Sequence, residues 1–179
     1  FQSVTARTAG FNTIDMAALG SAGKLWICLL MIVGGSPAST AGGLKTATLA
    51  VLLLTTWSLL RRRGEVEAFG RSLPGELLRR ALVLAVLYLS LLAAVTLLLC
   101  VFLPRVPFVD VLFEACSACG TVGLSTGVTR SGDLAAGGKC VIIAAMYLGR
   151  VGPLTLLLAL TSGLRAARYT YPREDIVIG

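Results

Sequence analysis

The residues most capable of chemistry in this sequence form two short polar segments that resemble each other. Thr8–Thr13 reads T-A-G-F-N-T and Thr121–Thr126 reads T-V-G-L-S-T, so both follow the pattern T-x-G-x-[NS]-T at an offset of 113 residues. Glycine tolerates backbone angles that let an extended chain turn its carbonyl oxygens toward one point. Several converging oxygens replace the water shell of a dehydrated monovalent cation. These two T-x-G segments therefore predict a cation site built from backbone carbonyls, with ordinary surface turns as the alternative.

The match continues beyond the T-x-G segments, which indicates an internal repeat. Gly23-Lys24 matches Gly138-Lys139, and Gly34 matches Gly149, at an offset of 115 residues. Each copy contains a T-x-G segment, a polar loop, an apolar stretch that begins at Gly-Lys, and a break. Because a repeated order of elements is far more specific than one triplet, the sequence predicts two copies of one structural unit.

The composition indicates the kind of protein that holds these segments. Of 179 residues, 56% are hydrophobic and only 14% are charged, whereas soluble domains carry about 25% charged residues. The chain is therefore predicted to lie in a membrane, which excludes a cytosolic enzyme or a secreted disulfide scaffold. The sequence has no histidine, the commonest general base and metal ligand. No nucleotide-binding loop and no paired carboxylates in an apolar stretch are visible, so we expect neither an enzyme nor an organic cofactor.

The positive charge is concentrated beside the apolar stretches. Six arginines lie between Arg61 and Arg80, and the tail adds Arg165, Arg168 and Arg173. Basic residues at the ends of membrane spans are typical of cytoplasmic loops. The net charge of +7 is thus interpreted as membrane topology and not as nucleic-acid binding. It places the C-terminus of a multi-pass membrane protein in the cytoplasm.

Three apolar stretches are long enough to cross the hydrocarbon core, at residues 16–60, 77–103 and 137–170. The first is interrupted by GGSPASTAGG at 34–43 and the third by GRVGP at 149–153. Irregular backbone at membrane depth is tolerated where protein buries it or where it lines a watery cavity, although a kinked span is the alternative. Residues 104–127 are too few to cross twice. They predict a re-entrant element, with a short helix over 109–119.

The C-x-x-C pair Cys116 and Cys119 suggests a metal or redox site at first sight. A structural zinc site needs two further cysteine or histidine ligands at suitable spacing, and the sequence has none. These thiols are therefore predicted to be small buried side chains on an apolar helix.

Five motifs in this order resemble the C-terminal part of a cation-translocating subunit of the Trk/Ktr/HKT superfamily, with KtrB-type potassium uptake subunits the most similar. They are TARTAGFNT, GGSPASTAGGLKT, FEACSACGTVGLSTG, GRVGPLTL and YPREDIVIG. The resemblance implies an all-α membrane protein built from potassium-channel-like repeats of helix, re-entrant pore helix, pore loop and broken transmembrane helix. Four such repeats surround one pore in that family. Residues 1–76 would end the third repeat and residues 77–179 would form the fourth, with the chain a fragment that lacks the re-entrant helix expected before Thr8. The resemblance further implies a location in a prokaryotic plasma membrane.

The resemblance also implies residue roles. The filter carbonyls that hold potassium would belong to Thr8, Ala9, Gly10, Phe11 and Asn12, and to Thr121, Val122, Gly123, Leu124 and Ser125 within residues 120–126. The intramembrane gate at 34–45 would comprise Gly34, Gly35, Ser36, Ser39, Thr40, Gly42, Gly43 and Lys45. Arg150 would project into the pore beside this loop.

The repeat alignment places Arg150 opposite Gly35, well inside its apolar stretch. A buried charge at that depth is costly and indicates function, so Arg150 is predicted to form a positive barrier, with a snorkelling arginine as the alternative. Lys45 either holds the loop through backbone carbonyls or lies in a wet cavity. Glu114 either orients a filter amide or attracts cations, and Arg7 either braces the first T-x-G segment or is a charge at the extracellular rim.

The expected function is translocation of potassium, with or without sodium, driven by the membrane potential. A sodium-selective relative and a non-conducting membrane scaffold or truncated remnant are the alternatives. The implied partners are membrane lipid, the missing N-terminal repeats of the same polypeptide, a second copy in a homodimer and a cytosolic nucleotide-binding regulatory subunit.

Overall fold

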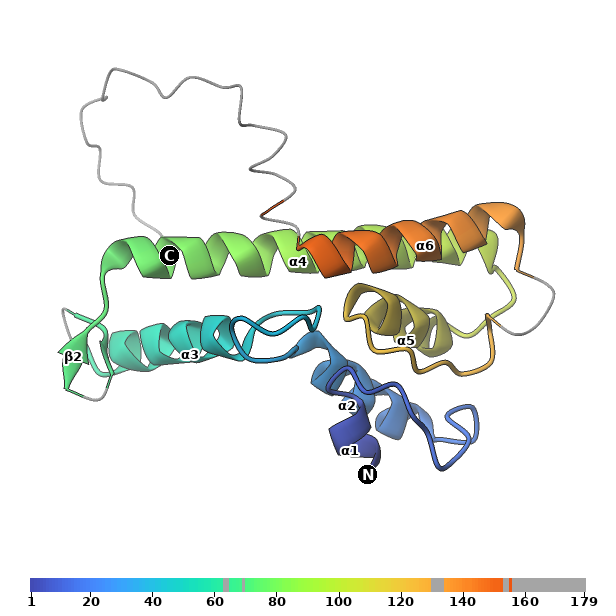
Figure 1. Cartoon of the computed structure of the whole chain (residues 1–179), viewed down its shortest axis with the longest axis horizontal. Helices are drawn as coiled ribbons and strands as arrows, with labels where there is room; N and C mark the ends of the chain where they lie inside the picture. Colours follow the sequence, from blue (N-terminus) through green and yellow to red (C-terminus); the bar gives the residue numbers. More distant parts are fainter. Residues whose placement is uncertain (63–64, 69, 130–133, 153–154, 156–179) are drawn as a thin grey trace, which may run out of the picture.

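One long apolar helix, α4, lies along one edge of this chain, with shorter helices and glycine-rich connections packed beside it (Figure 1). The computed structural model describes residues 1–62, 65–68, 70–129, 134–152 and 155. The elements in chain order are α1 Gln2–Thr5, α2 Ser21–Ile32, α3 Thr46–Leu60, β1 Glu67–Ala68, β2 Arg71–Ser72, α4 Gly75–Phe102, α5 Phe108–Cys119 and α6 Ala136–Val151.

Helix α4 is made of leucine, alanine and valine over most of its 28 residues, and Pro74 precedes its first turn. Proline suits a helix start, because its fixed φ is compatible with the first turn and its missing N–H is not needed there. At 1.5 Å per residue α4 is about 42 Å long, which exceeds the hydrocarbon thickness of a bilayer. Among the described residues it is the one helix long and apolar enough to cross a membrane by itself.

The stretch 16–60 forms two shorter apolar helices, α2 of 12 residues and α3 of 15 residues. Between them, residues 33–45 form a loop, which we call the G-loop. Val33 and Leu44 pair in a parallel bridge at its neck. The amide of Gly34 donates to the carbonyl of Leu44 at 2.7 Å, and the amide of Leu44 donates to the carbonyl of Ile32 at 2.9 Å. The backbone groups freed by the break therefore bond to one another.

Helix α5 is the centre of the packing, because it contacts α2, α4 and α6. From Val111 to Cys119 it is buried apart from the half-buried Leu112, and Phe113, Cys116 and Cys119 are fully enclosed. Figure 1 shows α6 beside α4 and α5 next to α6. Helix α2 packs against α5. A short helix so enclosed rigidly positions the chain that follows its last turn.

Several details differ from the sequence-based expectations. A single helical turn, α1 at Gln2–Thr5, precedes Thr8 where no helix was assigned. An antiparallel pair, β1 with β2, forms within the arginine-rich connection, where no strand was expected. The long helix is Gly75–Phe102 where 77–103 was expected, and the re-entrant helix is Phe108–Cys119. Of the stretch expected at 137–170, most of the part beyond Gly152 lies outside the described residues, as does the basic tail.

Candidate functional site: two T-x-G segments and the G-loop

The two T-x-G segments share an unusual backbone conformation. In the first, Thr8 has φ +68° and Gly10 φ +77°; in the second, Thr121 has φ +54° and Gly123 φ +93°. Positive φ is a genuine outlier for β-branched threonine, and such strain clusters at functional sites. A plain strand alternates its carbonyls from side to side, and a left-handed residue at every second position interrupts that alternation. Each segment can therefore present neighbouring carbonyls on one side.

The two T-x-G segments touch at Gly10. A Cβ at this position would lie 2.4 Å from the carbonyl oxygen of Val122, a distance that real Cβ atoms do not reach. Gly10 thus serves two purposes, because it supplies the positive φ and allows the second segment to approach.

Helix α5 holds the second T-x-G segment with two side chains. Glu114, only 5% exposed, accepts hydrogen bonds at Oε1 from the hydroxyl of Ser125 at 2.5 Å and from the amide of Thr126 at 3.0 Å. The hydroxyl of Ser117 accepts from the amide of Gly123 at 3.2 Å. Of the two roles open for Glu114, the structure thus gives it backbone orientation.

The first T-x-G segment is held by the short helix α1. The hydroxyl of Thr5 donates to the carbonyl of Phe11, and the amide of Gly10 donates to the carbonyl of Thr5 at 3.4 Å. Phe11 is 73% exposed and Asn12 is also exposed, whereas Val122 and Leu124 in the second segment are buried. The two segments thus have one backbone shape in different surroundings.

The G-loop folds back on itself closely enough to require glycine. A Cβ on Gly34 would lie 1.9 Å from the carbonyl oxygen of Gly42, and Gly43 has φ +77°. Gly34 and Gly42 are buried, Gly35 and Gly43 are half-buried, and Ser36, Ser39 and Thr40 are exposed at the tip.

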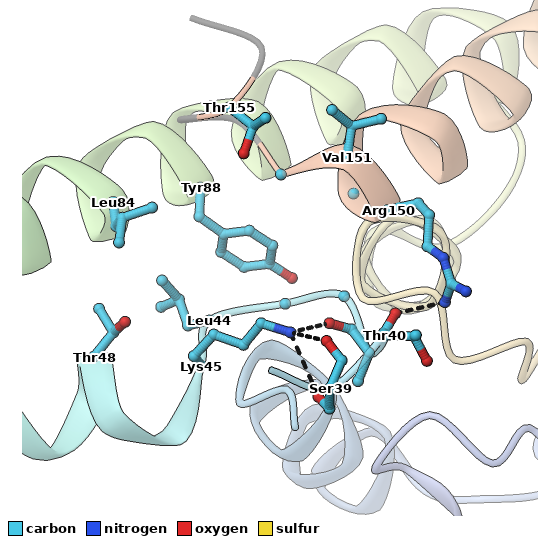
Figure 2. Close-up of a pocket in the computed structure, with 15 residues that line it drawn as sticks. Ser39, Thr40, Leu44, Lys45, Thr48, Leu84, Tyr88, Arg150, Val151 and Thr155 are labelled. Atoms are coloured by element: carbon cyan, nitrogen blue, oxygen red, sulfur yellow. Dashed lines mark hydrogen bonds between the residues drawn. The ribbon is translucent and has the colours of Figure 1, made fainter. Parts of the chain in front are cut away.

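Three basic side chains bind carbonyl oxygens of the G-loop. The ammonium of Lys45 donates to the carbonyls of Ser39 at 2.9 Å and Ala41 at 2.6 Å (Figure 2). The guanidinium of Arg150 donates to the carbonyl of Thr40. Arg7 Nη2 donates to the carbonyl of Gly34 at 2.9 Å.

Lys45 binds loop carbonyls and also lines the cavity described below. Arg7 binds the carbonyl of Gly34 in the G-loop, a contact that neither of its expected roles included. Arg150 is exposed beside the loop tip, and its role as a positive barrier in a pore stays a prediction. Helix α6 continues through Arg150 to Val151, so the charge sits on a helix end and not within a loop.

A cavity of about 430 Å³ lies between the G-loop, α4 and the end of α6. Its wall includes Lys45, Arg150 and Tyr88, and none of the described residues that line it is acidic. Tyr88 is 2% exposed, and its hydroxyl has no hydrogen-bond partner within the described ranges. The sequence did not identify Tyr88 as a candidate site residue, because a single tyrosine in an apolar helix is usually part of the hydrophobic core.

An ion pair fixes the start of α5 to the start of α2. Lys24 Nζ lies 2.7 Å from Asp110 Oδ1, and the two side chains are 11% and 17% exposed. Lys24 belongs to the repeated Gly-Lys pair, which is the only sequence signal of this contact. Cys116 and Cys119 are buried and free of disulfides, and no cluster of metal-ligating side chains occurs in the described part of the chain.

Comparison with known proteins agrees with this architecture. The TrkH family model, described as cation transport protein, matches residues 1–168. The chain is 39% identical over its whole length to Ktr system potassium uptake protein D of Bacillus subtilis, covering 39% of that protein. It is 41% identical to the potassium/sodium uptake protein NtpJ of Enterococcus hirae, covering 40% of it. The chain thus spans about two fifths of the length of these curated relatives.

The fold resembles a solved transporter as well. The crystal structure of the potassium transporter TrkH from Vibrio parahaemolyticus superposes on 88% of this chain and 35% of that chain, with a TM-score of 0.72 at 23% identity. Together, the fold and the family match define an all-α membrane protein of the helix–pore loop–helix class. The chain belongs to the TrkH family of cation transport proteins, and the resemblance to Trk/Ktr proteins is confirmed.

Proposed function

We propose that this chain forms part of a potassium-conducting pore in its native polypeptide, with the two T-x-G segments as its share of the selectivity filter. The observation that carries the proposal is the repeated pair of positive φ angles at Thr8 and Gly10 and at Thr121 and Gly123. This alternation turns backbone carbonyls to one side, which suits a dehydrated monovalent cation. The first segment's exposed edge leaves room for filter strands from the remaining repeats.

The G-loop is proposed as the gate of this pore. The loop contacts the second T-x-G segment at Gly42, whose amide donates to Thr121 Oγ1 at 3.0 Å. Lys45 and Arg150 add two positive charges beside it, which oppose a cation while the loop is in this position. The cavity behind the loop gives it space to move.

Sodium is the second candidate ion. The relative from Enterococcus hirae is named a potassium/sodium uptake protein, and at 41% identity it is as similar to this chain as the potassium uptake proteins are. A homodimer, a cytosolic nucleotide-binding regulatory subunit and a cytoplasmic C-terminus complete the proposal. They rest on the resemblance to Ktr systems and on the basic connection after α3.

Uptake of rubidium, a potassium substitute, tests the proposal in bacterial cells that lack their own potassium transporters and express the native polypeptide. Gly10→Ala forces a Cβ against Val122 and Gly123→Ala strains the backbone, so each is expected to reduce uptake at least about tenfold. Gly75→Ala is the control, because its Cβ would meet nothing within 4 Å. Normal uptake by both filter variants would refute the filter assignment, and no uptake by the wild type would favour a non-conducting scaffold. Competition by sodium distinguishes the two ions.

A further inference from the structure

We propose that the G-loop contains a second monovalent cation site, which Lys45 fills with its own ammonium group in the structure described here. The proposal rests on the proposed pore function and deepens it. A permeating potassium ion would compete with Lys45 for the same oxygens, so that the cation itself releases the loop.

The first argument is the set of atoms around Lys45. Its Nζ lies 2.9 Å from the carbonyl oxygen of Ser39, 2.6 Å from that of Ala41 and 3.5 Å from Ser39 Oγ. An ammonium has three donors, and these three oxygens match that number. Carbonyl and hydroxyl oxygens are also what coordinates potassium in protein filters, and an ammonium group is close to potassium in size and charge. The loop is thus a small oxygen cage that holds a tethered cation.

The second argument is charge balance. Among the described residues, the lining of the cavity behind the cage includes Lys45 and Arg150 and no acidic side chain. In the part of the chain that the structure describes, the Lys45 ammonium donates to neutral oxygens, two carbonyls and one hydroxyl. Neutral oxygens coordinate potassium as well as an ammonium group, so this kind of site permits the exchange of one for the other.

The third argument is a place for the displaced lysine. The hydroxyl of Tyr88 is buried without a partner at the wall of the same cavity, and Figure 2 shows both Tyr88 and Lys45 extending into it. A buried, unpaired hydroxyl costs free energy and needs an explanation. Its oxygen can accept a hydrogen bond from the ammonium once Lys45 leaves the cage, and Thr48, one turn into α3, offers a second hydroxyl on the same wall.

The exchange can be followed in the wild-type protein by the reactivity of its lysines. The purified native polypeptide is treated briefly with acetic anhydride at fixed pH and ionic strength, while rubidium replaces N-methylglucamine, and acetylation is measured by mass spectrometry. Lys45 acetylation is expected to rise at least threefold with rubidium. Lys24, which is paired with Asp110, and the exposed Lys139 serve as internal references and are expected to remain constant. Constant reactivity of Lys45 across the series would overturn the proposal.

Ion counting provides the second test. Lys45→Met removes the tethered cation, so equilibrium binding is expected to detect one additional rubidium ion per chain, whereas Lys45→Arg and the control Lys139→Met are expected to add none. The same gain is expected in a Lys45→Met/Gly123→Ala double variant, because the loop site does not use the T-x-G carbonyls. No gain in Lys45→Met would refute the loop site while leaving the filter proposal intact. A gain combined with normal uptake in Gly123→Ala would refute the filter and leave the loop site standing.

Discussion

Thr121 and Gly42 are 79 residues apart in sequence, yet the amide of Gly42 donates a hydrogen bond to Thr121 Oγ1 at 3.0 Å. This contact joins the second T-x-G segment to the G-loop. The approach is so close that a Cβ on Gly42 would lie 2.8 Å from the same hydroxyl oxygen. Because Thr121 is held at positive φ, a shift of the loop acts directly on a strained residue.

Arg150→Ala is expected to increase rubidium uptake by the native polypeptide roughly tenfold, because it removes a charged hydrogen bond worth about 1.5–3 kcal/mol from the loop tip. The bond is the one to the carbonyl of Thr40. Initial uptake rates at several membrane potentials measure the effect. Arg71→Ala, at an exposed strand position, is the control. Unchanged rates in Arg150→Ala would contradict a barrier role.

Gly149→Ala is expected to destabilise the protein by about 1–3 kcal/mol through overpacking. A Cβ on Gly149 would lie 2.1 Å from the carbonyl oxygen of Cys119, so α6 would have to move away from α5. Thermal unfolding in detergent measures the change in Tm. In the control Gly23→Ala the nearest atom to the new Cβ is a leucine methyl at 3.8 Å, and the better helix propensity of alanine predicts an equal or higher Tm. Equal Tm values for Gly149→Ala and wild type would show that this contact is loose.

Glu114→Ala is expected to weaken the discrimination between potassium and sodium, because it leaves the amide of Thr126 and the hydroxyl of Ser125 without their acceptor. Glu114→Gln keeps a carbonyl oxygen at the same position and should retain most of the selectivity. Competition between rubidium and sodium during uptake measures the ratio, and hydrogen exchange of the Thr126 amide reports the loss of the bond directly. If Glu114→Ala kept the wild-type ion selectivity while the Thr126 amide exchanged faster, Glu114 would support the backbone without affecting the choice of ion.

Lys24→Met is expected to destabilise the protein by roughly 3 kcal/mol, because it leaves the Asp110 carboxylate largely buried without its partner. The double variant Lys24→Met/Asp110→Leu removes both charges and should regain most of the lost stability. Unfolding midpoints of the two single variants and the double variant give the coupling energy. Additive losses would show that the two side chains act independently.

The sequence was informative where function depends on local backbone requirements. Glycine and threonine at fixed spacing predicted two equivalent segments, and the structure has the same pair of positive φ angles in both. The all-α membrane class was also predictable, because a stretch such as Gly75–Phe102 leaves few alternatives.

Contacts between residues far apart in the chain could not be predicted from the sequence. Arg7 binds Gly34 across 27 positions, and no periodicity relates these two residues. The contact between Arg150 and the carbonyl of Thr40 could not be predicted for the same reason. The turn of α1 was missed because a run of four residues carries almost no helical pattern.

The bridge between Val33 and Leu44 has a consequence for how this family can vary. It holds the end of α2 next to the start of α3. The number of residues in the loop can therefore change without changing the positions of the two helices. Loop closure costs little more free energy for each added residue once the ends are fixed. Insertions or deletions between Ser36 and Thr40 should therefore leave α2 and α3 in place while changing how far the tip extends. The length and sequence of this loop can therefore differ between relatives while the surrounding helices keep the same arrangement.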